Sequence, residues 1–517
     1  MASSTSGAYR AMKRLLILAT LVGTAMLPGV ALADGGYYSG TLGARATGRA
    51  GAFAARADDL SAVSFNPAGL ANLEATLVEV GNQASYNAYS YTRTPTYDYG
   101  DGHQDPATGA APLITFDKVS NRKPWQAVVP MLGAAARLGL ENWGFALAAY
   151  APPGISQLAF PVFPLTATTA ENGRHDGQRY MMIDREAIIL KYVASAAWKY
   201  DDRFGIGATA EWIHVPRLRY SLMIDGSATV LAANPVWSDF DMLVRLKGSS
   251  LFTFNAILGA WYRPVPTLML GLSGQVVPTS IVAKSTLDVS SFGGGFGSEG
   301  VYLTRRGTGA RANDVTLTLP LPLLARAGIR YRNLVNERER FDVELDVEYV
   351  TWSRAQRFTI DTNDLEANYG PTRIPLKQIA IEKHWRDTVA VRLGGDYAAI
   401  PGWLALRACG YYESAVARPA YANVDFSGAA QYGGAVGASV FIQRFEVVAA
   451  YMLKLQPSVT VSEADARVYQ QVPASRCSED PSYCNANLTG PSPAINAGTY
   501  TASSHLLYLG FLYRYGL

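Results

Sequence analysis

Histidine, cysteine and serine often carry catalysis or bind metals, but their spacing in this chain supports neither role. The five histidines are scattered along 517 residues, and none has the H-x-x-x-H or Cys/His spacing of a zinc or iron site. The chain has no G-x-S-x-G nucleophile motif and no G-x-x-x-x-G-K-S/T phosphate loop. We therefore predict that the protein is not an enzyme and holds no metal or cofactor.

A run of alternating acids is the densest group of ionisable side chains. Within residues 342–349 every even position is acidic and every odd position is apolar. Paired carboxylates can act as general acid and base. However, an arginine-rich run at 326–332 has the same parity, and only an extended strand sorts side chains with period 2. We interpret the two runs as antiparallel neighbours whose charged faces meet in a structural network.

Period-2 alternation continues along most of the chain. The alternation rule gives about fourteen strand-like segments between Ala75 and Leu517. Tight turns such as Asp201-Asp202-Arg203 alternate with long polar connections such as residues 463–500. Outer-membrane barrels have short periplasmic turns and long outer loops. The sequence thus predicts an all-β fold, a 14-stranded antiparallel transmembrane β-barrel whose lumen is polar.

The composition and the ends of the chain agree with an outer-membrane location in a Gram-negative bacterium. Charged residues make up 17% of the chain, against about 25% in soluble domains. A basic start, an apolar run at 15–27 and an A-x-A site at 31–33 predict a cleaved signal peptide over residues 1–33. The last strand ends in an alternating aromatic face that resembles the signal read by the barrel assembly machinery. That machinery is therefore a predicted partner.

The predicted mature chain is electrically neutral. Residues 1–33 hold three basic residues and no acids, and the whole chain has 45 basic and 42 acidic residues. A neutral protein has no electrostatic footprint for nucleic acid, so we exclude that partner class.

A Gly/Ala-rich segment and a turn signal precede the first strand. Residues 40–57 are rich in glycine and alanine, and the sequence Phe65-Asn66-Pro67-Ala68-Gly69-Leu70 follows. Pro67 has a fixed φ and no backbone donor, and Asn66 is suited to cap or start a turn. On its own, this pattern indicates only a turn.

Several motifs, taken in order, resemble one family. They are Ala50-Gly51-Ala52, Ala57-Asp58-Asp59, the stretch from Phe65 to Leu70, the stretch from Leu345 to Ser353, Trp385-Arg386-Asp387-Thr388, the stretch from Val391 to Tyr397, and the stretch from Leu406 to Tyr411. The chain is similar to the long-chain fatty acid transporter family of outer-membrane proteins, which includes the toluene and xylene uptake channels.

The resemblance implies an N-terminal hatch at residues 34–74 that plugs a barrel formed by residues 75–517. It further implies passive uptake of hydrophobic small molecules, fatty acids or aromatic hydrocarbons, with hatch-gated lateral release into the outer-membrane lipid. In the family, the Asn-Pro-Ala triplet contacts an inward kink of the third strand. Asn66, Pro67 and Ala68 would carry this gating contact, and Pro152-Pro153-Gly154 is the candidate kink. We expect a monomer.

Three further groups of residues are candidates for the site. Apolar residues in the loop after the third strand could form a capture surface, or could simply pack as loop core; they are Ile155, Leu158, Phe160 and Phe163. Lumenal cations could bind a carboxylate head group, or could pair with the acidic strand; they are Arg326, Arg330, Arg392 and Arg407. Cys477 and Cys484 could close a small disulfide loop.

Two other interpretations stay open. A general porin or a purely structural barrel would have an unplugged polar lumen. An outer-membrane barrel hydrolase would need a Ser/His or Asp/His constellation near the outer rim, and none is recognisable.

Overall fold

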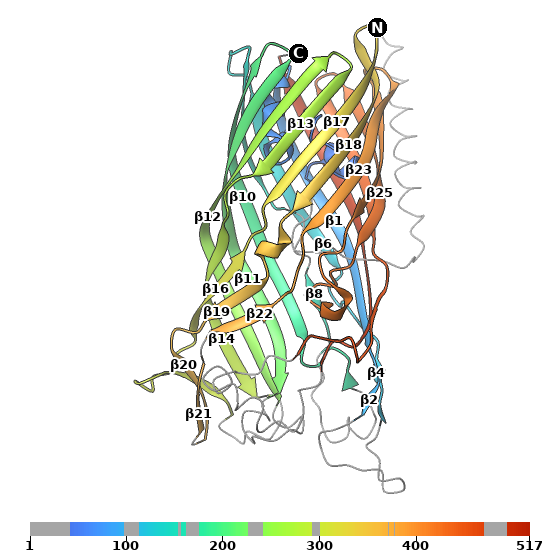
Figure 1. The fold of residues 1–517 in the computed structure, drawn as a ribbon. Coiled ribbons are helices and arrows are strands. Elements are labelled where there is room, and N and C mark those ends of the chain that lie inside the picture. The colour runs from blue at the N-terminus through green and yellow to red at the C-terminus, as the bar shows by residue number, and fades with distance from the viewer. Residues whose placement is uncertain are drawn as a thin grey trace, which may run out of the picture.

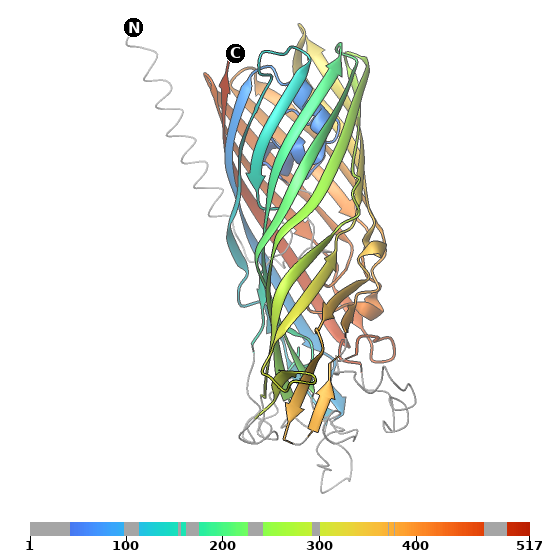
Figure 2. The ribbon, with the colours of Figure 1, turned by 90° about the vertical axis from the view of Figure 1, so that its left-hand side faces the viewer.

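The alternating segments pair into one closed wall in the computed structural model (Figures 1 and 2). The structure describes residues 42–97, 113–152, 157–161, 175–225, 241–291, 300–370, 372–376, 378–469 and 494–516. The predicted signal peptide and the two cysteines Cys477 and Cys484 lie outside these ranges. None of the helices within these ranges is long and apolar enough to cross a membrane.

The wall is a closed antiparallel barrel of fourteen strands, some of which are interrupted. It closes because β1 pairs with β28 on one side and with β6 on the other. In chain order, the wall consists of β1 (Thr76–Arg93), β5 (Val119–Ser120) with β6 (Trp125–Ala136), β7 (Trp143–Tyr150) with β8 (Leu158–Ala159), β10 (Met182–Tyr200), β11 (Phe204–Asp225), β12 (Asp241–Val265), β13 (Leu268–Gln275) with β14 (Ser280–Ser291), β16 (Asp314–Pro320) with β17 (Leu324–Val335), β18 (Arg338–Val350) with β19 (Arg357–Asp361), β22 (Ile379–Glu382) with β23 (Thr388–Ile400), β24 (Leu404–Glu413), β25 (Gln431–Ile442), β26 (Phe445–Leu455) with β27 (Val459–Val461), and β28 (Gly498–Tyr515).

Short elements decorate this wall. At the end with the long connections, small sheets form from β2 (Thr96–Tyr97) with β3 (Leu113–Ile114), from β4 (Phe116–Asp117) with β9 (His175–Asp176), and from β15 (Tyr302–Arg305) with β20 (Leu365–Tyr369) and β21 (Thr372–Pro375). The helical turns are α2 (Ala44–Gly48), α3 (Ala62–Phe65), η1 (Pro67–Asn72), η3 (Trp352–Arg354) and η4 (Pro419–Tyr421). The predicted fold class is confirmed.

The register between β17 and β18 is the one that the charge pattern predicted. Arg326 lies opposite Glu348, and Arg330 lies opposite Glu344. The apolar residues between them face outward; Ile329 and Leu345, for example, are exposed on the outer surface. The charged faces of both strands therefore meet inside the barrel.

The polar lumen does not extend along the whole barrel, which corrects the sequence-based expectation. On β11, Ile213 and Val215 are buried, but beyond Pro216 the buried position moves to Leu218. The pairing of β11 with β12 shifts register here, as a β-bulge does, and proline cannot donate to the ladder. The bulge exchanges the two faces of the strand. The outer part of the barrel consequently has a polar exterior and an apolar lumen.

Candidate functional site

Residues 42–73, which we call the lumenal segment, lie inside the barrel (Figure 2). The segment contains α2, α3 and η1. Helix α2 packs against β25 and β26, whereas η1 packs against β10, β11 and β12 on the other side of the wall. Nearly all of its side chains are buried. The segment thus fills the half of the lumen next to the tight turns.

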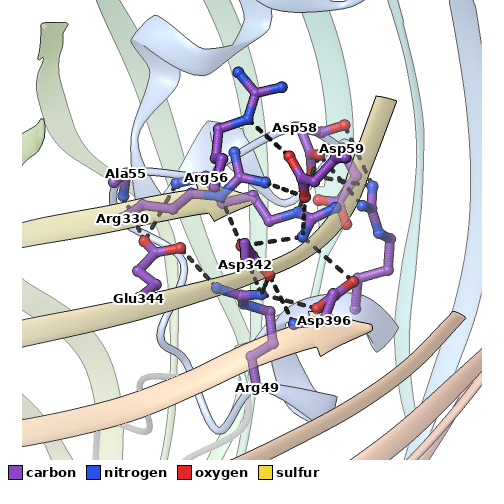
Figure 3. A network of polar contacts seen from close by, with 12 residues as sticks. Arg49, Ala55, Arg56, Asp58, Asp59, Arg330, Asp342, Glu344 and Asp396 are labelled. Atoms are coloured by element: carbon purple, nitrogen blue, oxygen red, sulfur yellow. Dashed lines mark hydrogen bonds and ion pairs between the residues drawn. The ribbon is translucent and has the colours of Figure 1, made fainter. Parts of the chain in front are cut away.

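Arg49 is the centre of the polar network that fixes the lumenal segment (Figure 3). Its guanidinium is fully buried and contacts three carboxylates of the wall, Asp342 at 3.0 Å, Glu344 at 2.8 Å and Asp396 at 2.8 Å. Burial opposes the charge of Arg49, but these carboxylates outweigh burial and raise the pKa of the guanidinium. A buried arginine with three acidic partners stays charged and holds the segment to β18 and β23.

A second arginine of the segment extends this network. Arg56 contacts Asp58 at 3.1 Å, Asp342 at 3.2 Å and Asp396 at 3.4 Å. Asp58 also contacts Arg45 at 3.0 Å. Burial favours the neutral form of Asp58, but Arg45 and Arg56 outweigh it and hold the pKa of this carboxyl well below its ordinary value.

The acidic strand β18 also binds the backbone of the lumenal segment. Asp346 accepts hydrogen bonds from the backbone N–H groups of Phe53 and Ala54, each over 2.8 Å. Glu344 accepts one from Ala55 over 2.7 Å. The alternating acids are therefore acceptors for a buried irregular backbone, whose donors would otherwise be unsatisfied. Sequence reasoning identified these acids but not their main partners, because Arg49 lies nearly three hundred positions away.

The four predicted lumenal cations lie in the same plugged half. Arg326 contacts Glu348 at 2.6 Å and Arg330 contacts Asp342 at 2.6 Å. Arg392 also pairs with Glu348 and Arg407 pairs with Asp396, at 3.0 and 2.8 Å respectively. Arg326 further donates to the backbone carbonyl of Ser64 in the lumenal segment. In this arrangement all four cations serve the structural network.

The Asn66-Pro67-Ala68 triplet is hydrogen-bonded to β12 of the wall. The Asn66 side-chain amide donates to Ala54 over 2.8 Å and to the backbone carbonyl of Ala260 on β12 over 3.0 Å. Its oxygen accepts from the backbone of Ala68 and caps η1. The Ala68 carbonyl accepts from the Trp261 indole over 3.0 Å. The described polar contacts of the triplet to the wall are thus to β12, not to the third strand.

Glycines on the inner face of the wall make room for this close approach. A Cβ on Gly207 of β11 would lie 2.5 Å from the backbone nitrogen of Ala68. A Cβ on Gly259 of β12 would overlap the Asn66 side chain. A side chain at either position would displace the triplet, so its fit depends on these two glycines, which the sequence reasoning missed.

The described pairing of the third wall strand stops and resumes on either side of the predicted kink. Pairing between β7 and β10 ends at Tyr150 with Lys191, and pairing resumes where Leu158 of β8 meets Arg185. Pro152 lies in this interruption, while Pro153, Gly154 and Ile155 are outside the described residues. Residues 186–190 of β10 consequently have no described ladder partner on this side.

Two of the predicted capture residues are core residues in this structure. Leu158 and Phe160 are buried in an apolar cluster, and the Phe160 ring lies 6.0 Å from that of Tyr89. They line neither of the two apolar pockets described below. Phe163 is outside the described residues.

Two adjoining apolar pockets occupy the outer part of the lumen. The two pockets share part of their lining, because Tyr220, Leu246 and Ile381 line both. Most of the other lining residues are apolar; they include Ile189, Val215, Leu218, Ile281, Leu317, Leu319, Phe358, Leu222, Ile224, Met242, Val244, Leu287, Ile360 and Leu376. Sequence reasoning missed this site because the β-bulges reverse the side-chain parity that was extrapolated from the other half.

A few polar groups line the first pocket. The Arg185 guanidinium lies 4.0 Å above the ring of Phe426, and both residues line the pocket. Next to them, Asp425 accepts from Tyr220 over 3.2 Å and forms a buried ion pair with Lys383. Glu186 and Arg219 also line the pocket. An apolar surface beside a buried guanidinium suits a hydrophobic ligand with a polar end. In the described ranges, no group of three or more His, Cys, Asp or Glu side chains is arranged to hold a metal ion.

One known protein family matches most of this chain. Residues 25–425 match the family described as outer membrane protein transport protein (OMPP1/FadL/TodX). The chain belongs to this family. FadL/TodX-family proteins are outer-membrane transport proteins, and the resemblance seen in the sequence motifs is confirmed.

Solved structures of the OMPP1/FadL/TodX family share the fold. A FadL homologue of Pseudomonas aeruginosa is 16% identical, with a TM-score of 0.68 over 93% of this chain and 100% of that one. The toluene transporter TodX of P. putida is 13% identical, with a TM-score of 0.59 over 93% and 100%. The toluene transporter TbuX of Ralstonia pickettii is 13% identical, with a TM-score of 0.57 over 92% and 99%. No curated protein matches the sequence.

Proposed function

We propose that this chain is a passive outer-membrane channel for elongated hydrophobic molecules, with long-chain fatty acids as its main substrates. The observation that carries the proposal is the pair of adjoining apolar pockets in the outer lumen. Burying a hydrocarbon chain there is favourable at about 25 cal/mol per Å² of apolar surface. Two pockets in series, sharing Leu246, fit a long chain better than a single aromatic ring.

Arg185 supports a substrate with one anionic end. It is the buried arginine of the first pocket, and a carboxylate there would gain a charge-assisted hydrogen bond. A neutral aromatic hydrocarbon would contact the guanidinium but would form no charge-assisted hydrogen bond with it. The second candidate substrate class, aromatic hydrocarbons, is favoured by the fold shared with the toluene transporters TodX and TbuX.

The release route that we propose is lateral. The lumenal segment lies in the inner half of the barrel, in the way of a straight path to the periplasm. Ala187 and Ile189 line the first pocket and also belong to the part of β10 for which the described residues give no third-strand partner. An apolar ligand prefers lipid to water, so we propose that it leaves through this part of the wall. We propose that Asn66, Pro67 and Ala68 set the position of the lumenal segment during release.

Uptake of two labelled substrates tests the substrate class. We expect Arg185→Met to lower oleate uptake by cells roughly tenfold, the loss of about 1.4 kcal/mol, while toluene uptake stays unchanged. Leu246→Trp, which fills both pockets, should lower the uptake of both compounds. Arg357→Met removes an exposed arginine of β19 that is paired with Glu382 and serves as the matched control.

The outcomes separate the candidates. Equal uptake of oleate by the wild type and Arg185→Met would overturn the fatty-acid assignment and favour aromatic hydrocarbons. A large steady ionic current through the wild type in a planar bilayer would overturn the channel for hydrophobic molecules and favour a general porin.

A further inference from the structure

The outer wall carries a group of cations on three neighbouring strands, β11, β12 and β14. We call it the basic patch; its cations are Arg217, Arg219, Arg245, Lys247 and Lys284. All five are exposed on the exterior, beyond the bulge that reverses the faces of β11. The acids on the same face are Asp184, Glu186 and Asp288, so the patch has an excess of positive charge.

Two of these cations are direct cross-strand neighbours. Arg219 on β11 lies opposite Lys247 on β12, and like charges at directly opposite positions destabilise a sheet. Nearby acids compensate only in part. Glu186 lies 3.4 Å from Arg217 and 3.9 Å from Arg219, and Asp288 lies 2.9 Å from Lys247. Glu186 is thus shared by two arginines and Asp288 pairs with Lys247, so the five cations still outnumber the three acids of this face.

The patch borders the apolar belt of the barrel. Just below it on the same strands, Trp212, Phe252 and Val282 are exposed apolar residues. Aromatic side chains at the edge of such a belt mark the level of the lipid headgroups. The strands β10 to β14 thus place an excess of cations at headgroup height, on the side of the long loops that faces the outer leaflet.

We propose that the basic patch binds the phosphate groups of an anionic, phosphorylated glycolipid of the outer leaflet. The guanidinium groups of Arg217 and Arg219 would contact phosphate oxygens, and Lys247 would supply a point charge from the next strand. The acyl chains of the same lipid would lie on Phe252 and the apolar belt below it. The basic patch thus matches the phosphates of one lipid molecule, and the apolar belt matches its acyl chains. A soluble anion would contact the basic patch alone. This inference stands independently of the transported substrate.

Binding of a defined lipid tests the proposal. The probe is diphosphoryl lipid A, compared with its dephosphorylated form, added to the full-length protein in a neutral maltoside detergent. We expect native mass spectrometry to show at least roughly tenfold preference of the wild type for the phosphorylated lipid. The double substitution Arg219→Gln/Lys247→Gln should remove most of this preference. The control Arg357→Gln/Arg373→Gln removes two exposed cations outside the basic patch and should retain it.

Thermal unfolding gives a second readout. Without lipid, Arg219→Gln/Lys247→Gln should unfold at the same or a higher temperature than the wild type, because repulsion is relieved. Diphosphoryl lipid A should raise the unfolding temperature of the wild type more than that of the double variant. The proposal is overturned if the double variant keeps the full phosphate preference, or if inorganic phosphate or phosphatidylglycerol competes with lipid A at equal concentration.

Discussion

The side-chain amide of Asn66 donates a hydrogen bond to the backbone carbonyl of Ala260, across 3.0 Å, and so joins the lumenal segment directly to β12. The same amide donates to Ala54, and its oxygen caps η1 at Ala68. One short side chain therefore connects two parts of the segment and the wall. Because Asn66 is buried, water cannot replace these bonds.

Asn66→Ala should leave the barrel folded and located in the outer membrane but reduce fatty-acid uptake. The change removes the donor to the buried carbonyl of Ala54, at a cost of about 1–3 kcal/mol, and removes the bond to Ala260. The barrel wall keeps its own ladder. Uptake of labelled oleate by cells, normalised to the amount of heat-modifiable barrel, measures the effect. Asn82→Ala is the control, because Asn82 bonds within the wall at an exposed site. Normal uptake by Asn66→Ala would show that the triplet forms only a turn and has no role in uptake.

Gly207→Ala should displace the lumenal segment without preventing assembly of the barrel. The new Cβ would lie 2.5 Å from the backbone nitrogen of Ala68, and backbone cannot rotate away as a side-chain end does. We expect faster proteolysis of the segment in detergent and a higher ionic current in planar bilayers. Gly410→Ala is the matched control on β24, because its nearest heavy atom would be 3.9 Å away. If the two variants behave alike, Gly207 is not needed for the fit.

Sequence reasoning predicted the fold and the charged faces because both depend on local parity. Arg326 lies opposite Glu348 as expected, since two strands joined by a short connection can pair in few registers. It could not predict that Arg49 is the centre of the network, because nothing in the spacing links Arg49 to Asp342. It also missed the apolar pockets. The bulge at Pro216 exchanges the inward-facing and outward-facing positions of β11. Apolar and polar residues alternate on both sides of the bulge, so the sequence pattern does not reveal the exchange.

Arg49→Met should release the lumenal segment more strongly than any other single change in the network. It leaves Glu344 without the cation that it contacts and takes one of several cations from Asp342 and Asp396, and breaking a buried ion pair in this way costs about 3–5 kcal/mol. In planar bilayers we expect an ionic current that is selective for cations, because the exposed acids would line the opened lumen. Arg332→Met serves as the control, because Arg332 is partly exposed and pairs with Glu339. A closed Arg49→Met channel would show that other contacts suffice to hold the segment.

The attachment of the lumenal segment should withstand mild acid. Arg45 and Arg56 outweigh burial and hold the pKa of Asp58 well below its ordinary value of 3.8. When the pKa of a carboxyl is lower in the folded state than in the unfolded state, the carboxyl stabilises the fold fully at pH values above its unfolded pKa. This contribution is lost as the pH falls from the unfolded pKa through the folded pKa. The ionic current of the wild type should therefore stay low from pH 7 to about pH 5 and rise only below about pH 4. Asp58→Asn lacks this contribution at every pH, so its current should be higher than that of the wild type at pH 7 and show less additional rise in acid. An increase in wild-type current between pH 7 and pH 5 would contradict the role of Asp58.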